Sequence, residues 1–552
     1  MCQKKSKCVI TGITFCCVLF WGGFFDFAAI AMGAVFAGLL LILLHGKKKI
    51  LMPKGIILYS GILFGGSALA TCAFAFDKGA AWMGIVRIAA VFIFGLLWMN
   101  LEDHSRNDVF DAIPFAGACI NSIAFAAWFV PEIRSYFYSA GRLWGSMQYA
   151  NTWALFLLIG IIILLCKEKV SYQEWAEAVI LLVGIIMTGS RSVFVLTVVF
   201  GGWIFLKSRA DKKIKLLAAG LTVLILVVVQ MVMGLDIGRL AEISMNSSTF
   251  NGRLLYWQDA MNLIVRHPMG VGYMNYYFIQ PQIQTGYYFT KTVHNDLLQC
   301  VMDNGMAAAI SVIILVGYGL YSKKNSKRNK LVLLVLVLHS LFDFDFEFMV
   351  MACIFVMCLP IEDKQKETSL KLVRGVIGAA GCICVYFSVA LGADYFGNVN
   401  LSLAMYPYNT MARKELLSMK SDVSYQAAER IIKENGMIAE AWEVRLQQAV
   451  EESNYETALD AENQMLKCAG YDLYYYNQAV LCLSHVLDTA LRDGDLENGQ
   501  LILAEIQNVP DKIDQLKKRT SDRAWKLYEK PSFELDENIQ NYIQKLEGIQ
   551  LN

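Results

Sequence analysis

Long apolar runs recur through the first 391 residues, and they constrain the fold more than any other feature of the chain. Examples are "VFAGLLLILL", "AAVFIFGLLW" and "LTVLILVVVQMVMG". Each lies in a stretch near the length at which an α-helix crosses a lipid bilayer. Hydrophobic residues make up 56% of the 552 residues, against about 45–50% in soluble domains. The sequence therefore predicts an all-α, polytopic transmembrane bundle in a cell membrane.

We expect about 12–13 spans, because each of the following ranges is apolar and bounded by polar or basic residues. The ranges are 8–25, 27–44, 55–75, 80–100, 110–130, 151–166, 174–188, 192–206, 214–233, 297–320, 331–344, 347–360 and 373–391. No clear cleavage site follows the first run, so it is interpreted as an uncleaved helix and not as a signal peptide. The short spans 331–344 and 347–360 are interpreted as a tilted or re-entrant pair.

Basic residues are concentrated in alternate loops, which predicts how the spans are oriented. These loops contain Lys47, Lys48 and Lys49 and the segments 207–215, 323–330 and 364–371. Loops rich in lysine and arginine stay in the cytoplasm. The long loop 234–295 and the C-terminal region are therefore predicted on the outer side of the membrane. Tryptophan and tyrosine residues in this loop favour an ordered structure.

The C-terminal region has a different composition from the membrane domain predicted at 1–392. Residues 393–552 contain 26 acidic and 16 basic residues and read as paired amphipathic helices. Trp442 and Tyr476 lie 34 residues apart, and "NYETAL" resembles the tight turn of a tetratricopeptide repeat. We interpret this region as an extracytoplasmic, tetratricopeptide-like helical domain that binds a protein partner. An unrelated helical bundle is the alternative.

His294 is the strongest candidate for acid–base chemistry on the outer side. It lies in "KTVHNDLLQC", where a long polar loop gives way to an apolar helix. Asn295 and Asp296 can cap that helix and hold the imidazole at its start. A neutral histidine there can take a proton from a hydroxyl group. The alternative is a purely structural cap. His267, before a proline, and His339, beside "DFDFE", are interpreted equally well as structural; "DFDFE" itself is read as a solvated connector or substrate-facing rim.

Arginines form a second group of candidate residues. Arg191 lies in "MTGSRS", Arg253 starts an amphipathic helix with Trp257, and Arg142 lies in another outer loop. Guanidinium groups bind phosphate oxygens in forked pairs, so several on one face suit a pyrophosphate. Each could instead be an ordinary interfacial arginine. Arg87, in the middle of a span, is expected to face the bundle interior and to bind either a lipid phosphate or an acid such as Asp26 or Asp343.

The sequence lacks the motifs of several other functions. It has no Walker loop, no cytoplasmic DxD-like nucleotide-sugar site and no convincing metal-ligand spacing. The 14 cysteines show no disulfide framework. We therefore expect no metal, no cofactor and no nucleic-acid partner.

Three motifs in order resemble the O-antigen ligase and O-antigen polymerase family. They are "TGSRS", "NGRLLYWQDAMNLIVRHPMGVGY" and "HNDLLQCVMDNGM", and the match covers about residues 140–360. The resemblance implies a glycosyltransferase that uses a glycan on undecaprenyl pyrophosphate. It implies that Arg191 and Arg253 hold the pyrophosphate without a metal, that Ser190 orients Arg191, and that His294 deprotonates or positions the acceptor hydroxyl. Arg266 precedes the His-Pro pair at a position that varies in the family, so its role is open.

The sequence is also compatible with other functions. The motifs do not separate a polymerase from a ligase, so the acceptor is a glycan, a lipid, the wall or a protein. A transporter of polysaccharide or lipid-linked glycan is an alternative, although we find none of the internal repeats or broken helices typical of transporters. A membrane-anchored scaffold acting through residues 393–552 is a further alternative.

Overall fold

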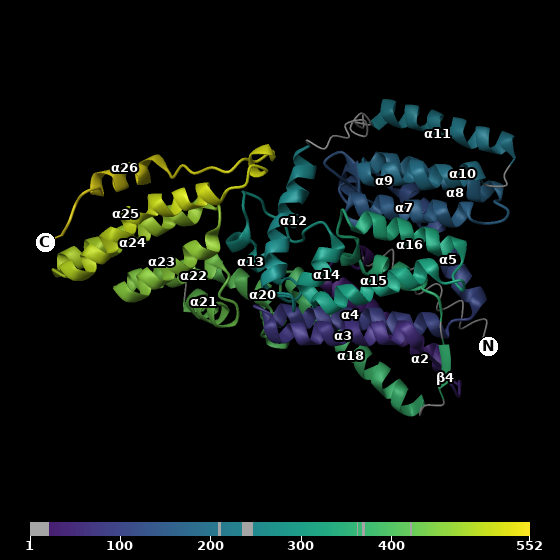
Figure 1. The fold of residues 1–552 in the computed structure, drawn as a ribbon, viewed down its shortest axis with the longest axis horizontal. Coiled ribbons are helices and arrows are strands. Elements are labelled where there is room, and N and C mark those ends of the chain that lie inside the picture. Colours follow the sequence, from purple (N-terminus) through teal and green to yellow (C-terminus); the bar gives the residue numbers. More distant parts are fainter. Residues whose placement is uncertain are drawn as a thin grey trace.

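The computed structural model describes residues 21–207, 211–233, 247–361, 363–366, 370–419 and 422–551. Regular structure in these ranges is almost entirely helical, and the only strands there form two two-stranded sheets (Figure 1). The predicted all-α, polytopic class is confirmed.

Within the described residues, five helices are long and apolar enough to cross a membrane: α2 (Asp26–Leu44), α3 (Gly55–Phe74), α4 (Lys78–Asn100), α5 (Asp103–Ala127) and α18 (Leu370–Tyr395). Other helices at predicted spans are α7 (Ala150–Leu165), α8 (Tyr172–Thr188), α11 (Lys212–Met233), α15 (Met306–Tyr321), α16 (Lys327–Ser340) and α17 (Met349–Met357). The first predicted span, 8–25, lies mostly outside the described residues. One large hydrophobic core joins many of these helices.

Two predicted spans are not single α-helices. The span 297–320 is divided at Gly305 into α14 (Asp296–Asn304) and α15. Gly305 has a φ of 84°, and a Cβ there would lie 2.8 Å from the carbonyl oxygen of Met269. The glycine therefore allows the turn that contains Met269, before α13 (Asn275–Ile283), to pack into the break. The span 192–206 consists of α9 (Arg191–Leu196), a π-helical turn η3 (Thr197–Gly201) and α10 (Gly202–Lys207).

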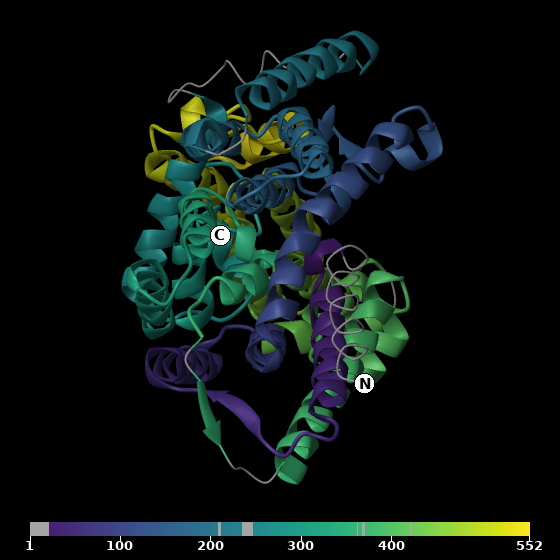
Figure 2. The ribbon, with the colours of Figure 1, turned by 90° about the vertical axis from the view of Figure 1, so that its right-hand side faces the viewer.

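A two-stranded sheet joins two basic segments at one end of the bundle. Strands β1 (Ile50–Pro53) and β4 (Asp363–Lys366) pair antiparallel and lie side by side in Figure 2. Arg374 donates a hydrogen bond to the carbonyl oxygen of Leu44 at 2.6 Å beside them. Residues 47–49 and 364–366 thus lie on the same side of the bundle, as their shared basic character predicts.

The long loop predicted at 234–295 is ordered where the structure describes it, and residues 234–246 lie outside the described part. It contains α12 (Ser248–Arg266) and α13 (Asn275–Ile283), which lie between the membrane helices and the C-terminal helices in Figure 1. Smaller elements are η1 (Trp21–Gly23), α6 (Pro131–Arg134), β2 (Tyr138–Ser139), β3 (Arg142–Leu143), η2 (Gly145–Met147) and η5 (Asp345–Glu347).

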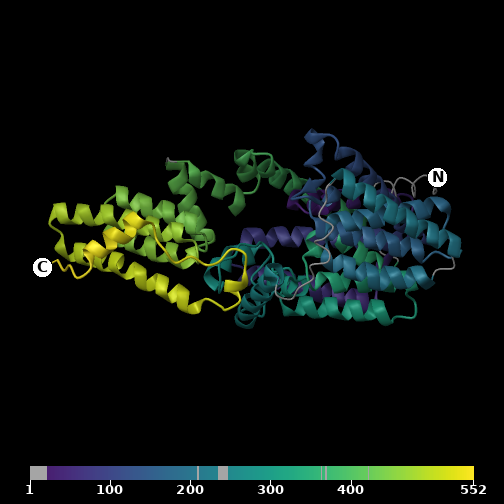
Figure 3. The same ribbon diagram turned by 90° about the horizontal axis from the view of Figure 1, so that it is seen from above.

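The C-terminal region is a series of helices that extends away from the membrane bundle (Figure 3). After α18 the elements are α19 (Val399–Met405), α20 (Thr410–Glu415), η6 (Leu416–Ser418), α21 (Asp422–Glu434), α22 (Ala439–Glu451), α23 (Tyr455–Ala469), α24 (Leu473–Asp493), α25 (Leu496–Arg519), η7 (Ala524–Lys526) and α26 (Glu537–Leu546). From α21 to α26 each α-helix packs on the next, and α22 to α26 share a separate core. The tetratricopeptide assignment stays a prediction.

The C-terminal helices and the β1–β4 sheet lie at opposite ends of the molecule (Figure 1). Helices α12 and α13, from the predicted long loop, lie between them.

Candidate functional site

The carboxylate of Asp343 is the centre of the candidate site. It lies in the turn between α16 and α17 and is fully buried. One carboxylate oxygen accepts a hydrogen bond from the hydroxyl of Tyr149 at 2.8 Å and lies 3.2 Å from Nδ1 of His294. The other accepts from the side-chain amide of Asn151 at 2.7 Å and from Arg253 at 3.2 Å. Segments far apart in the sequence thus meet at one buried charge.

The charge of Asp343 is stabilised by its neighbours. Burial alone would raise the pKa of this carboxyl, because a low-dielectric surrounding disfavours the ionised form. The hydrogen bond with His294 and the positive charge of Arg253 outweigh burial and hold the pKa of Asp343 below its usual value. Asp343 is therefore an anion at neutral pH, so it orients the imidazole and the guanidinium without itself exchanging protons.

The backbone fixes the position of His294. The residue has a φ of 51°, a left-handed conformation that is rare for a residue other than glycine. Trp257 donates its indole N–H to the carbonyl oxygen of Val293, the residue before it. Asn295, the residue after it, caps α14 by accepting hydrogen bonds from Leu297 and Leu298, as predicted for the helix start. A strained backbone held from both sides is typical of functional positions.

Arg253 retains donors that Asp343 does not use. It lies in the second turn of α12, and its side chain is 16% exposed. The Nε–H group is buried and has no hydrogen-bond partner among the described residues. A buried donor without a partner costs about 1–3 kcal/mol. An anion bound beside Arg253 would relieve that cost.

Arg142 and Arg191 join this cluster through a shared turn. Arg142 donates from Nε to the carbonyl oxygen of Thr188 at 2.6 Å and from a terminal nitrogen to Asn151 at 2.7 Å. α8 ends at Gly189 with a φ of 60°, and the chain turns there so that Arg191 starts α9. The backbone N–H of buried Ser190 donates to the Thr188 hydroxyl. The turn that contains Arg191 is thus bound to the same network as Asp343.

A second buried network lies beside the first and was not predicted. The hydroxyl of Ser192 lies 3.1 Å from Nε2 of His339, whose Nδ1 lies 2.6 Å from Asp345. Thr152 donates its hydroxyl to the other oxygen of Asp345 at 2.8 Å. The Ser190 and Ser192 hydroxyls are 3.5 Å apart. This network contacts the start of α9 through Ser190 and Ser192.

The interpretation of "DFDFE" as a solvated connector is wrong, and its position on a substrate-facing rim stays a prediction. Asp343 and Asp345 are both fully buried, and each binds a histidine. Two charges at the end of a short apolar helix would have been a signal, since an acidic residue near the membrane interior needs a partner. Tyr149 and Asn151, in "GSMQYANTW", carried no comparable signal, because either is ordinary at the start of a span.

Two arginines predicted as substrate-binding residues lie outside the cluster. Arg266 is exposed at the end of α12, 13 residues beyond Arg253, which is about 20 Å along a helix. Arg87 is buried and binds Asp26 at 2.5 Å and the backbone oxygen of Glu347 at 2.7 Å. Asp26 and Asp343 were the two acidic partners predicted for Arg87, and the structure pairs Arg87 with Asp26.

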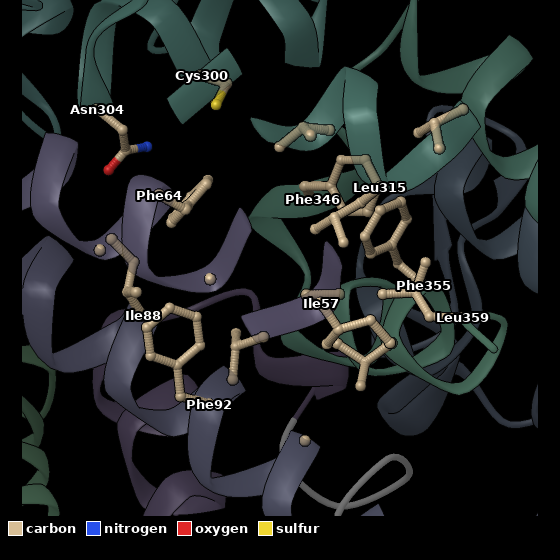
Figure 4. A pocket seen from close by; sticks show the side chains of 18 of the residues that line it. Ile57, Phe64, Ile88, Phe92, Cys300, Asn304, Leu315, Phe346, Phe355 and Leu359 are labelled. Carbon is tan, nitrogen blue, oxygen red and sulfur yellow. The ribbon is translucent and has the colours of Figure 1, made fainter. Parts of the chain in front are cut away.

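An apolar cavity of about 750 Å³ lies among the membrane helices (Figure 4). Its lining includes Met52, in β1, and Ile361, close to β4, and also Asp296 and Leu341, which are close in sequence to His294 and Asp343. Phenylalanines and aliphatic residues make up much of the lining and include Ile57, Phe64, Ile88, Phe92, Leu315, Phe346, Phe355 and Leu359. The cavity suits a long hydrocarbon chain.

No gathering of three or more His, Cys, Asp or Glu side chains suitable for a metal ion occurs in the part of the chain that the structure describes. The cluster instead combines cationic and imidazole groups around one carboxylate. Such a set binds and stabilises oxyanions and moves a proton.

Comparison with known proteins identifies the segment that contains much of this site. Residues 176–313 match the family model described as O-antigen ligase. The matched segment includes Arg191, Arg253 and His294, whereas Asp343 lies beyond it. A comparison with curated proteins gave no significant match. The helical fold, the apolar spans and the matched segment agree with a multi-pass membrane enzyme of surface-polysaccharide assembly. The segment 176–313 is therefore similar to the O-antigen ligase family.

Proposed function

We propose that the chain transfers a glycan from an undecaprenyl-pyrophosphate donor onto an acceptor hydroxyl at the outer face of the cytoplasmic membrane. The observation that carries this proposal is the binding of Arg253 and His294 to opposite oxygens of the buried Asp343 carboxylate. One anion thereby sets a diphosphate-binding group and a proton acceptor side by side.

The arginines stabilise the leaving diphosphate. Arg253 has a buried Nε–H without a hydrogen-bond partner among the described residues, and Arg191 starts α9 in the turn that Arg142 contacts. Arg142 holds that turn through Thr188. Negative charge grows on the diphosphate as its bond to the sugar breaks, and preorganised cations in a water-poor site stabilise that charge. Ser190 acts as a positioning residue for Arg191. A metal ion is not needed for this stabilisation.

His294 takes the proton of the acceptor. With Nδ1–H donated to Asp343, the ring presents Nε2 as the proton acceptor. The acceptor oxygen attacks the anomeric carbon and forms the new C–O bond. The bond between that carbon and the phosphate oxygen breaks, the electron pair leaves with undecaprenyl pyrophosphate, and the hydroxyl proton moves to Nε2.

The apolar cavity accommodates the first part of the polyprenyl chain. Two of the residues that line it, Asp296 and Leu341, lie two residues from His294 and Asp343, respectively, in the sequence. A hydrocarbon chain inside it would bring the attached diphosphate up to the arginines. The lysine distribution supports an outer position for this site and for residues 393–552, where the helical domain also binds a protein partner.

The experiment that tests the proposal is transfer by the purified full-length chain in detergent, supplied with a lipid-linked glycan extracted from the source cells. Arg253→Ala and His294→Ala should each reduce transfer by about 10²–10⁴-fold. Arg266→Ala is the matched control, because it removes an arginine from the same helix outside the cluster. Full activity of either cluster variant would refute the proposal. Retained transfer in EDTA tests metal independence. The products separate a polymerase, which lengthens the glycan, from a ligase.

A further inference from the structure

The C-terminal domain returns to the candidate site with one short segment, residues 521–529, called the return segment here. It follows α25 and contains η7 (Ala524–Lys526). In Figure 1 the chain after α25 runs back from the C-terminal helices to α12, the helix that carries Arg253. The backbone N–H of Ser521 donates to the carbonyl oxygen of Thr285 at 2.8 Å, and that of Tyr528 donates to the Ser248 hydroxyl at 2.7 Å.

The buried side of the return segment fits tightly against the outer loop. Ala524 is fully buried and packs with Leu255 and Tyr288, and Leu527 joins the same small core. A Cβ at Gly286 would lie 2.5 Å from the Cβ of Ala524, so only glycine allows this approach. Two backbone hydrogen bonds and a closely packed core hold the segment in one position.

The same core reaches His294. Tyr256 packs against this core, as Leu527 does, and the Tyr256 ring centroid lies 4.5 Å from that of Tyr288 and 6.2 Å from that of His294. Tyr528 binds Ser248, which lies five residues before Arg253 on α12, an axial distance of about 8 Å. The return segment therefore lies within roughly one or two sugar rings of the reacting groups.

The outer side of the segment presents two aromatic rings. Tyr528 is 91% exposed and Trp525 is 44% exposed. They follow directly after Ala524, which is buried, and Leu527, which is partly buried. Phe533 supports Trp525, with ring centroids 6.1 Å apart. Large apolar rings in a rigid, exposed position beside an active site indicate a ligand that covers them.

We propose that Trp525 and Tyr528 form a binding subsite for the acceptor glycan. A sugar ring has an apolar face of C–H groups that packs on an aromatic ring, while its hydroxyls bond to charged neighbours such as Lys526 and Glu529, both of which are exposed. The glycan bound there places its acceptor hydroxyl at His294. This inference rests on the proposed function and identifies the acceptor of that reaction as a carbohydrate.

The test measures binding of one defined probe to the full-length chain in nanodiscs. The probe is the free glycan released by mild acid from the lipid-linked donor of the source cells. The double variant Trp525→Ala/Tyr528→Ala should bind at least tenfold more weakly. Trp525→Phe/Tyr528→Phe, which keeps both rings, should bind within threefold of the wild type. Tyr172→Ala removes an aromatic residue that is 80% exposed at the start of α8 and serves as the control.

The kinetic counterpart distinguishes acceptor binding from a structural effect. The alanine pair should raise the acceptor KM about tenfold with kcat and the donor KM unchanged, and the phenylalanine pair should restore the KM. Unchanged glycan binding in the alanine pair, or equal loss in both pairs, overturns the inference. The inference is also overturned if the alanine pair binds anionic lipid vesicles more weakly than the wild type but binds the glycan with unchanged affinity. That result would assign the rings to a membrane surface.

The proposed function and the acceptor subsite can be refuted independently of each other. His294→Ala should retain glycan binding while it loses transfer. If His294→Ala still transfers glycan, the proposed function is wrong, whatever the aromatic variants do. If His294→Ala is inactive and the aromatic variants behave as the wild type, only the acceptor subsite is wrong.

Discussion

His294 and Asp343 lie 49 residues apart in the chain and 3.2 Å apart in the fold. The carboxylate is fully buried, and its other oxygen binds Arg253. Removal of this one charge should therefore affect both the proton acceptor and the diphosphate-binding group.

Asp343→Asn should reduce both activity and stability. The change leaves Arg253 partly buried without its anion, and breaking a buried charge pair from one side costs about 3–5 kcal/mol. We expect transfer to fall by about 10²-fold or more because the imidazole loses its orienting partner. Thermal unfolding in detergent and transfer by the purified variant measure the two effects. A stable, fully active Asp343→Asn protein would contradict the assigned role.

The contribution of Asp343 to stability should persist to low pH. Its pKa is lowered in the folded state, so the stabilisation is fully present above the unfolded pKa of about 3.9 and is lost as the pH falls through the folded value. The difference in melting temperature between the wild type and Asp343→Asn should be constant between pH 5 and 8. A difference that already vanishes near pH 6 would show that Asp343 is not held ionised.

In the second buried network, substitution of His339 should destabilise the protein more than substitution of Ser192. His339→Ala leaves the buried Asp345 carboxylate without its imidazole, at a cost of about 3–5 kcal/mol. Ser192→Ala removes one hydrogen bond to that imidazole, at a cost of about 1–3 kcal/mol. Thermal unfolding of the two variants in the same detergent ranks them. The opposite order would mean that the His339–Asp345 contact contributes little.

The orientation of the chain can be measured with reporters. The β1–β4 sheet and the C-terminal helices lie at opposite ends of the molecule, and lysine gathers near the sheet. A phosphatase that folds only outside the cytoplasm should be active when fused after residue 552. The same reporter inserted between residues 47 and 49 should be inactive. The reverse pattern would place the candidate site in the cytoplasm and remove its lipid-linked donor.

Hydropathy predicted the positions of most membrane helices, because a continuous apolar run leaves an α-helix as the only backbone that satisfies its own hydrogen bonds in lipid. It did not predict the break at Gly305. Residues 303–305 are Asp-Asn-Gly, a polar turn signal inside the range predicted as one span, and the close approach of the Met269 carbonyl shows why the helix stops there. A contact between distant segments cannot be seen in a local pattern.

The candidate site could be predicted only in part for a similar reason. Arg253 and His294 carry recognisable motifs, and the structure brings them together. Asp343, which joins them, lies in a turn whose alternating phenylalanines looked solvent-exposed in the sequence. Arg266 carries the right chemistry and a nearby position in the chain, but helical geometry places it at the far end of α12. Residue type alone cannot decide between these arginines.

The most direct test of the central claim is the affinity of the full-length chain in nanodiscs for undecaprenyl pyrophosphate. We expect Arg253→Ala to bind this product at least tenfold more weakly, and Arg266→Ala and His294→Ala to bind it as the wild type does. Equal affinity in Arg253→Ala and the wild type, or an equal loss in Arg266→Ala, would contradict a diphosphate site built around Arg253.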